Sequence, residues 1–410
     1  MRKSLSTSSN GEGLQGSLPV ALVDDSVPAM KEGTAISTVS SVSTSPVSPL
    51  LEEHADLGAS FTDFAGWQMP LKYDSELIEH RAVRSTAGLF DLSHMGEIVI
   101  TGPAAGALLD YALVGELSKI GIGRAKYSLL CNAEGGVIDD LVVYRLADEH
   151  FLVVANASNA PTVARELVSR AEGFDAEVDD QSAQTALIAV QGPAAQDIVQ
   201  ALVQDEQVAV VTELRYYAVT PASVAGIDVL LARTGYTGED GFELYVPNEQ
   251  AVRLWRALLD ATTGRGGVPA GLACRDTLRL EAGMALYGHE LTLDTNPYEA
   301  GLGKVVRLGK EFVGRNALQE LSERPIERML VGLKGTGRRA ARTDYTVYDA
   351  AGETAVGVVT SGALSPTLGY PVALAFVDAA LQEFGTELTV DIRGKKEPFV
   401  VTASPFYRRS

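Results

Sequence analysis

Two segments of this chain repeat one short pattern, and the repeat limits the folds that are available. Residues 98–105 read IVITGPAA and residues 188–195 read IAVQGPAA. In each segment an apolar strand runs through a glycine into a proline, which is expected in the first turn of a helix. Proline is tolerated there because the first helical N–H groups have no partner within the helix. The repeat predicts two related units of mixed α and β structure.

Further strands and helices are expected around this repeat. Residues 151–155 form an apolar run typical of a strand, and residues 164–171 favour a helix. Beyond residue 326 short apolar runs alternate with turn residues, which predicts a small all-β barrel or sandwich. Three of these runs lie at 331–333, 346–348 and 357–360. The predicted fold class is therefore α+β.

The charge balance argues against several classes of partner. The chain has 53 acidic and 34 basic residues and a formal net charge of −19, which disfavours nucleic acid or an anionic membrane as the main partner. No apolar run reaches the roughly 18 residues that a membrane span requires. Cys131 and Cys274 are too few for a disulfide framework, so we expect buried thiols in a reducing, cytoplasmic compartment.

The first 48 residues are expected to form a disordered tail. They are rich in Ser, Thr, Gly and Pro and show no sustained hydrophobic period. They lack the apolar core of a signal peptide and contain too few arginines for a transit peptide. Residues 11–16, GEGLQG, match the glycine pattern of dinucleotide-binding loops, but no strand precedes them and no helix follows. We interpret that match as accidental.

Two adjacent carboxylates interrupt the apolar run at residues 135–144, GGVIDDLVVY. A buried carboxylate must be hydrogen-bonded or neutralised, so Asp139 and Asp140 require local partners or a polar ligand. Successive strand residues point to opposite faces, so the pair is not expected to share one environment. One can face a pocket while the other meets backbone or solvent. The alternative is structural, with the pair capping N–H groups after the Gly-Gly turn.

A third acidic residue lies in a predicted hairpin. Strands are expected at 229–233 and 242–246, joined by a loop whose three glycines allow backbone angles that other residues resist. Alternation in the second strand puts Glu243 and Tyr245 on one face, opposite the core. The alternative for Glu243 is an exposed strand residue.

An arginine without a partner is predicted on the next helix. Residues 273–282 are expected to be helical and to end at a glycine, with Arg275 and Arg279 one turn apart. Asp276 can pair with Arg279, which leaves Arg275 without an obvious helical partner. The alternative for Arg275 is an ordinary surface arginine.

A set of polar side chains on otherwise apolar elements suits the binding of a flat heterocycle that has hydrogen-bond donors and acceptors along its edges. The candidates are Asp139, Asp140, Glu243, Arg275, Tyr127 and Tyr407. Taken singly each also has a structural explanation, and His94 is more often a satisfied structural imidazole than a catalytic one. The sequence lacks a zinc-peptidase helix, a phosphate-binding loop, a nucleophile elbow and a lysine set for a Schiff base.

Several motifs in order make the chain from residue 50 onward similar to the T protein of the glycine cleavage system. The most specific is RTGYTGEDG at 233–241, and the others are DFAGWQMP at 63–70, GLFDLSHMG at 88–96, GGVIDDL at 135–141 and SPTLG at 365–369. The resemblance implies three domains in a cloverleaf around a central folate pocket, two of them α+β and the C-terminal one barrel-like. The expected boundaries are 49–95 plus 181–295 for the first domain, 96–180 for the second, 296–325 for a linker and 326–410 for the third.

The resemblance also implies a reaction. Enzymes of this family transfer the methylene of an aminomethyl group, carried on the lipoyl arm of the H protein, to tetrahydrofolate and release ammonia. Asp140, rather than Asp139, matches the residue expected beside the folate N5/N10 region. Folate-binding positions of the family match Glu243, Arg275 and Tyr407, to which we add Tyr127 and Asn156 as expected pocket residues. Tetrahydrofolate is implied as co-substrate, with no metal, pyridoxal phosphate or flavin.

Two rival interpretations involve folate-binding relatives. A relative that supports iron-sulfur assembly has a Lys-Gly-Cys-Tyr-x-Gly-Gln-Glu stretch, whereas this chain has CRDTLRLE at 274–281. Dimethylglycine and sarcosine dehydrogenases carry a large flavin domain, for which this chain has no room. Because the chain is acidic, the H protein and the glutamate tail of folate require a local basic patch. The candidates for that patch are Arg275, Arg307, Lys310 and Arg315.

Overall fold

The computed structural model, which describes residues 46–409, places the two repeated segments in two different sheets. The first sheet has the strand order β10-β11-β12-β9-β3-β13. Its strands are β3 (Gly88–Asp91), β9 (Thr185–Gln191), β10 (Val219–Val224), β11 (Ile227–Ala232), β12 (Gly241–Pro247) and β13 (Val268–Pro269). β3 pairs antiparallel with β9, although the whole second sheet lies between them in the sequence. The first sheet is therefore assembled from two separate stretches of the chain.

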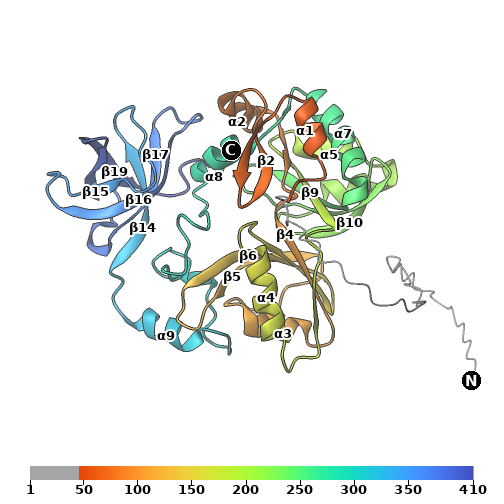
Figure 1. The fold of residues 1–410 in the computed structure, drawn as a ribbon, viewed down its shortest axis with the longest axis horizontal. Coiled ribbons are helices and arrows are strands. Elements are labelled where there is room, and N and C mark those ends of the chain that lie inside the picture. Colours follow the sequence, from red (N-terminus) through yellow and green to blue (C-terminus); the bar gives the residue numbers. More distant parts are fainter. Residues whose placement is uncertain (1–45, 410) are drawn as a thin grey trace, which may run out of the picture. The chain divides into compact units, whose positions relative to one another are not determined.

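The second sheet lies in the sequence between β3 and β9 (Figure 1, orange to yellow). Its order is β5-β6-β7-β4-β8, and every neighbouring pair is antiparallel. The strands are β4 (Gly96–Thr101), β5 (Arg124–Cys131), β6 (Val137–Ala147), β7 (His150–Ala155) and β8 (Glu177–Asp180). Helices α3 (Ala105–Ala112) and α4 (Ala160–Arg170) share an apolar core with one face of this sheet. The strand predicted at 151–155 is confirmed, and the helix predicted at 164–171 lies largely within α4.

The repeated glycines are required by the backbone. Gly102 and Gly192 have φ values of +110° and +137°. A Cβ atom at Gly102 would lie 2.7 Å from the carbonyl oxygen of Asp175, and one at Gly192 would lie 2.5 Å from that of Thr86. Only glycine combines such a backbone with such close approach. The following prolines lie in the turn before each helix and not in its first turn, since the helices begin two residues later.

The remaining α-helices lie before the barrel in the sequence, together with a small hairpin. The helices are α1 (Leu51–Asp56), α2 (Glu76–Ser85), α5 (Ala195–Gln200), α6 (Val208–Thr212), α7 (Asn248–Thr263), α8 (Leu272–Glu281) and α9 (Arg315–Glu323), and the hairpin pairs β1 (Ser60–Phe64) with β2 (Trp67–Lys72). Side chains of α5 and α7 share an apolar core with one face of the first sheet. The predicted helix at 273–282 corresponds to α8.

The two sheets pack against each other through their other faces. One core cluster joins Phe90, Leu187 and Tyr245 of the first sheet to Tyr144 and Leu152 of the second. The first sheet is therefore covered on both faces. Tyr245 does face away from the helix-covered core, as predicted, but that face is itself buried because it meets the second sheet.

The C-terminal residues form a closed barrel (Figure 1, blue). Its strand order is β14-β17-β16-β15-β18-β19. The strands are β14 (Arg328–Gly335), β15 (Thr346–Tyr348), β16 (Ala355–Leu364), β17 (Pro371–Asp378), β18 (Glu387–Ile392) and β19 (Lys395–Thr402), with apolar side chains filling the interior. The α+β fold class with a C-terminal β-barrel is confirmed.

The predicted N-terminal tail lies outside the described residues up to residue 45. Its last residues belong to the folded structure. Val47 forms an isolated bridge with Gln68, and the buried Ser48 hydroxyl donates to Asp91. The prediction therefore extended the tail a few residues too far.

Candidate functional site

Asp140 lies on β6 between two apolar clusters on one face of the second sheet. One cluster joins Leu129 and Val137 to the segment that follows α8. The other joins Tyr144 and Val154 to the first sheet. A half-buried carboxylate thus stands where three parts of the chain meet.

Asp140 is held by neutral donors only. Its carboxylate accepts hydrogen bonds from the Tyr127 hydroxyl at 3.0 Å and from the Asn156 amide at 2.9 Å. No Lys, Arg or His among residues 46–409 forms an ion pair with it. Burial raises the pKa of Asp140 to about 6, and the two hydrogen bonds lower it only in part. The group therefore remains free to stabilise a positive charge on a ligand.

Asp139 has a structural environment on the other side of the strand. It accepts hydrogen bonds from the Asn156 backbone N–H at 3.0 Å and from the Asn159 amide at 2.7 Å, and so holds the turn from β7 into α4. Asp139 and Asp140 thus point to opposite faces of β6, as predicted. The environments are nevertheless linked, because the Asn156 amide contacts Asp139 and Asp140 at 2.9 Å each. Burial, and then the neighbouring Asp140, raises the pKa of Asp139.

Glu243 projects from β12 into the space between the sheets. It is half-buried, and its Oε2 atom accepts a hydrogen bond from the Thr234 hydroxyl. Burial raises its pKa, while the Thr234 hydroxyl and the charge of Arg275 act in the opposite direction. No described residue donates a hydrogen bond to Oε1. That oxygen is available to a ligand.

Arg275 lies near Glu243 and is not paired. Asp276 pairs instead with Arg279 at 2.7 Å, as predicted from the helical spacing. The Arg275 guanidinium lies over the Tyr236 ring, 4.9 Å from its centroid, and makes no hydrogen bond in the part of the chain that the structure describes. Burial lowers the pKa of Arg275, and Glu243 acts against this. A half-buried arginine without a hydrogen-bond acceptor can bind an acceptor on a ligand.

Two tyrosines that the sequence did not single out complete the group. The Tyr217 carbonyl accepts from the Ala125 N–H of β5 at 2.9 Å and the Tyr217 N–H donates to the Arg233 carbonyl at 3.0 Å, so Tyr217 lies between the two sheets, where burial raises its pKa. The Tyr236 ring lies under the Arg275 guanidinium, and burial raises the pKa of Tyr236. Tyr217 has φ of +57°, a conformation rare outside glycine and often found at functional sites. Nothing in a single sequence signals such a conformation.

Tyr407 does not contact this group. Its ring lies under the Arg84 guanidinium, 4.0 Å from it, and its N–H donates to the Glu281 carbonyl at 2.8 Å. It lines a separate cleft of about 640 Å³. The cleft is also lined by Arg84, Pro193, Thr212, Glu213, Leu214, Arg215, Tyr216, Arg233, Glu239, Asp240 and Arg409. The two sites are adjacent, since the Tyr216 and Tyr217 ring centroids are 5.0 Å apart.

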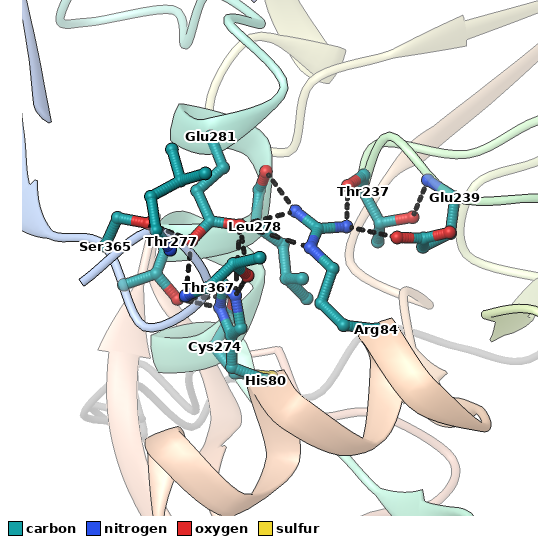
Figure 2. Close-up of polar contacts among 11 residues, drawn as sticks. His80, Arg84, Thr237, Glu239, Cys274, Thr277, Leu278, Glu281, Ser365 and Thr367 are labelled. Atoms are coloured by element: carbon teal, nitrogen blue, oxygen red, sulfur yellow. Dashed lines mark hydrogen bonds and ion pairs between the residues drawn. The ribbon is translucent and has the colours of Figure 1, made fainter. Parts of the chain in front are cut away.

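Another buried carboxylate, that of Glu281, joins α2 and α8 to the barrel (Figure 2). It accepts hydrogen bonds from His80 at 3.1 Å, from Arg84 at 2.9 Å and from the Thr367 backbone at 3.0 Å, and also from the Ser365 hydroxyl. Burial opposes its ionisation, but His80, Ser365 and Arg84 outweigh this and lower its pKa to about 2. Ser365 and Thr367 belong to the SPTLG motif, so the structure gives that motif a role in attaching the barrel.

His94 and the two cysteines are buried. The His94 ring packs edge-on against Phe64, with centroids 5.3 Å apart, and burial followed by the charge of Arg275 lowers its pKa to about 4. Its Nδ1 atom has no hydrogen-bond partner among the described residues. Cys131 and Cys274 are buried free thiols, as predicted.

The predicted basic patch is only partly available. Lys310 donates to the backbone carbonyls of Asp110 and Leu113, and Arg315 donates to that of Leu308 at 3.0 Å. The side chains of Lys310 and Arg315 are therefore already bound to backbone carbonyls of the protein. Arg307 remains exposed.

The described residues include neither a cluster arranged to hold a metal ion nor a helix that could span a membrane. Between residues 46 and 409 no group of three or more His, Cys, Asp or Glu residues is arranged to hold a metal ion. None of the described helices has both the length and the apolar character needed to cross a membrane.

Comparison with family models covers most of the chain. Residues 50–310 match the GCVT N-terminal domain, and residues 328–408 match the glycine cleavage T-protein C-terminal barrel domain. Together the two matches include Asp140, Glu243, Arg275 and Tyr407.

Curated relatives and a solved structure agree with the family models. The aminomethyltransferase of Streptomyces avermitilis is 57% identical over 362 residues, covering 87% of this chain and 96% of the relative. That of Cutibacterium acnes is 56% identical, covering 88% and 98%. The crystal structure of glycine cleavage system aminomethyltransferase T from Bartonella henselae has a TM-score of 0.81 at 39% identity and covers 89% of this chain and 98% of its own.

Proposed function

Since the chain belongs to the glycine cleavage T-protein family and is an aminomethyltransferase, we propose that Asp140, Glu243 and Arg275 hold tetrahydrofolate while a methylene group is transferred to it. The donor we propose is the aminomethyl group on the lipoyl arm of an H protein. The bonds from its carbon to the lipoyl sulfur and to nitrogen break, and two bonds to folate N5 and N10 form. The two protons that N5 and N10 lose appear on ammonia and on the thiol.

The setting of Asp140 carries this proposal. Its carboxylate has two neutral donors and no cation, so it can accept a hydrogen bond from the attacking folate amine and orient it. It also stabilises the positive charge that develops on the iminium carbon and nitrogen. Both effects depend on the ionised form of Asp140.

The other residues suit the two polar edges of a pterin. The free Oε1 atom of Glu243 can accept from the N–H groups of the aminopyrimidine edge, and a charge-assisted bond of this kind is strong. Arg275 supplies donors that no described residue uses. Tyr217 and Tyr236 supply ring faces for stacking.

Tyr407 is proposed to meet the outer part of the folate and not its ring. It lies in the adjacent cleft, beyond Tyr216. Arg215 and Arg409 also line this cleft and suit the carboxylates of the glutamate tail. This cleft therefore replaces the patch first expected for that tail, while Arg307 is retained as a candidate for H-protein contact.

The test is to mix the protein with aminomethylated H protein and tetrahydrofolate and to measure ammonia and methylenetetrahydrofolate. Asp140→Asn is expected to reduce the rate by about 10²- to 10⁴-fold, the usual contribution of a positioned acid or base. Asp228→Asn, an exposed acidic residue on β11, serves as the matched control and is expected to keep the wild-type rate. Wild-type turnover by Asp140→Asn would refute the assigned role.

A further inference from the structure

A line of buried hydroxyl groups runs between the two sheets and ends at Glu243. The Tyr245 hydroxyl lies 3.4 Å from that of Tyr144, which lies 2.9 Å from the Thr234 hydroxyl. Thr234 in turn donates to the Oε2 atom of Glu243. Tyr144, Tyr245 and Thr234 are 1%, 5% and 4% exposed, so water does not compete for these contacts.

The number of available protons fixes the direction of this line. Each hydroxyl has one proton to donate. Thr234 uses its proton on the Glu243 carboxylate, so it must accept from Tyr144. Tyr144 has then used its own proton and must accept from Tyr245. Every donor points toward Glu243, which makes this carboxylate the final acceptor.

The line also ties Glu243 to the strand that carries Asp140. Tyr144 and Asp140 lie four residues apart on β6 and so point to the same face of the second sheet. Glu243 belongs to β12 of the first sheet, and Thr234 follows β11 of that sheet. The line therefore crosses from Tyr245 of the first sheet to Tyr144 of the second, and the Tyr144–Thr234 hydrogen bond leads back to the first sheet.

We propose that Tyr144 is a positioning residue that acts through Thr234 to orient Glu243 and to fix its place relative to Asp140. This inference rests on the proposed function, in which Glu243 and Asp140 contact different parts of one folate molecule. The hydrogen bond from Thr234 occupies Oε2 and fixes the rotation of the carboxyl group. Oε1 then points to the ligand before the ligand arrives, which reduces the ordering cost of binding.

The test measures tetrahydrofolate affinity by calorimetry in four variants. Tyr144→Phe and Thr234→Val each remove one hydroxyl and are expected to weaken binding about 2- to 10-fold, the range for one hydrogen bond. Thr234→Ser keeps the hydroxyl and is expected to bind within 2-fold of wild type. Tyr348→Phe, in the barrel strand β15, is the matched Tyr-to-Phe control and is expected to bind like wild type.

A double variant separates positioning from general packing. If Tyr144 acts through Glu243, then Tyr144→Phe weakens binding in the wild-type background and adds nothing in the Glu243→Ala background. An equal loss in both backgrounds would overturn the proposal, as would wild-type affinity of Tyr144→Phe together with weak binding by Glu243→Ala. Wild-type affinity of Glu243→Ala alone would instead refute the proposed folate contact, and this inference with it. Circular dichroism verifies that each variant is folded.

Discussion

Glu281 and Asp140 are both carboxylates set between packed parts of the chain, and their partners differ in kind. Glu281 is surrounded by His80, Arg84, Ser365 and Thr367, and its pKa is lowered to about 2. Asp140 has only a phenol and an amide, and its pKa is raised to about 6. The first group is fully satisfied by the protein. The carboxylate of Asp140 can still accept a hydrogen bond from a ligand or pair with a cationic one.

This difference separates a residue that stabilises the fold from one that performs chemistry. A buried ion pair lowers the energy of the folded chain only while both partners are present. A buried carboxylate with neutral donors costs stability in its ionised form, and that cost is recovered when a cationic group binds. Four measurements test whether Glu281 and Asp140 differ in this way.

The largest effect is expected from Glu281→Gln. The change removes one of the two carboxylates that pair with the buried Arg84, which keeps Glu239 at 2.9 Å, and removal of one partner of a buried pair costs up to about 3–5 kcal/mol. The free energy of unfolding in urea measures it. Glu320→Gln is the matched control, because Glu320 pairs with Arg324 on an exposed helix surface and is expected to cost less than about 0.5 kcal/mol. Asp140→Asn should not lower stability, and equal losses for all three variants would remove the contrast.

Acid unfolding is expected to follow Glu281. Its folded pKa of about 2 lies below the usual 4.5, so its contribution is present above pH 4.5 and is lost as the pH falls toward 2. A difference of this size corresponds to roughly 3 kcal/mol. Urea titrations between pH 2 and 6 measure it, and Glu281→Gln should show a weaker pH dependence than wild type. An identical dependence would show that other groups are responsible.

Glu243→Ala is expected to weaken tetrahydrofolate binding by about 1–3 kcal/mol, the range for a hydrogen bond to a charged group. The unfolding free energy should change little, because Glu243 has no ion-pair partner among the described residues. Calorimetry gives the affinity. Glu177→Ala, on an exposed position of β8, serves as control and should bind like wild type. Unchanged affinity in Glu243→Ala would count against the proposed contact.

The smallest effect is expected in the pH dependence of turnover. Because Asp140 must be ionised and its pKa is about 6, kcat/KM should fall about tenfold for each pH unit below 6. An aspartate with the usual value of 3.8 would give no loss until near pH 4. Glu281 remains ionised throughout this range, so its protonation does not account for the loss. A rate that stays constant from pH 7 to 4.5 would contradict the assignment.

Local patterns predicted much of the fold. The repeated strand–Gly–Pro segment, the barrel strands and α8 were recognisable because each depends on neighbours in the sequence. The pairing of β3 with β9 and the packing of the two sheets depend on residues far apart, so no local pattern reveals them. For the same reason the burial of the face that carries Glu243 and Tyr245 was not anticipated.

The residues of the candidate site were likewise predicted only where the signal was local. The Asp139-Asp140 pair stood out because charges interrupt an apolar run, and the spacing of Asp276 and Arg279 indicated that Arg275 was unpaired. Tyr217 was missed because its backbone conformation is set by the fold. Glu281 was missed because its partner His80 is 201 residues away in the sequence. Tyr407 was grouped with the others by resemblance, and the structure places it beside Arg84.

The pairing of β3 with β9 has a consequence for synthesis on the ribosome. β3 is made early, but its antiparallel partner β9 is made only after every strand of the second sheet. The nascent chain must therefore keep an apolar strand, Gly88–Asp91, from pairing wrongly while the inserted sheet folds. A pause in translation between these two strands would lengthen that exposure and favour aggregation over correct assembly.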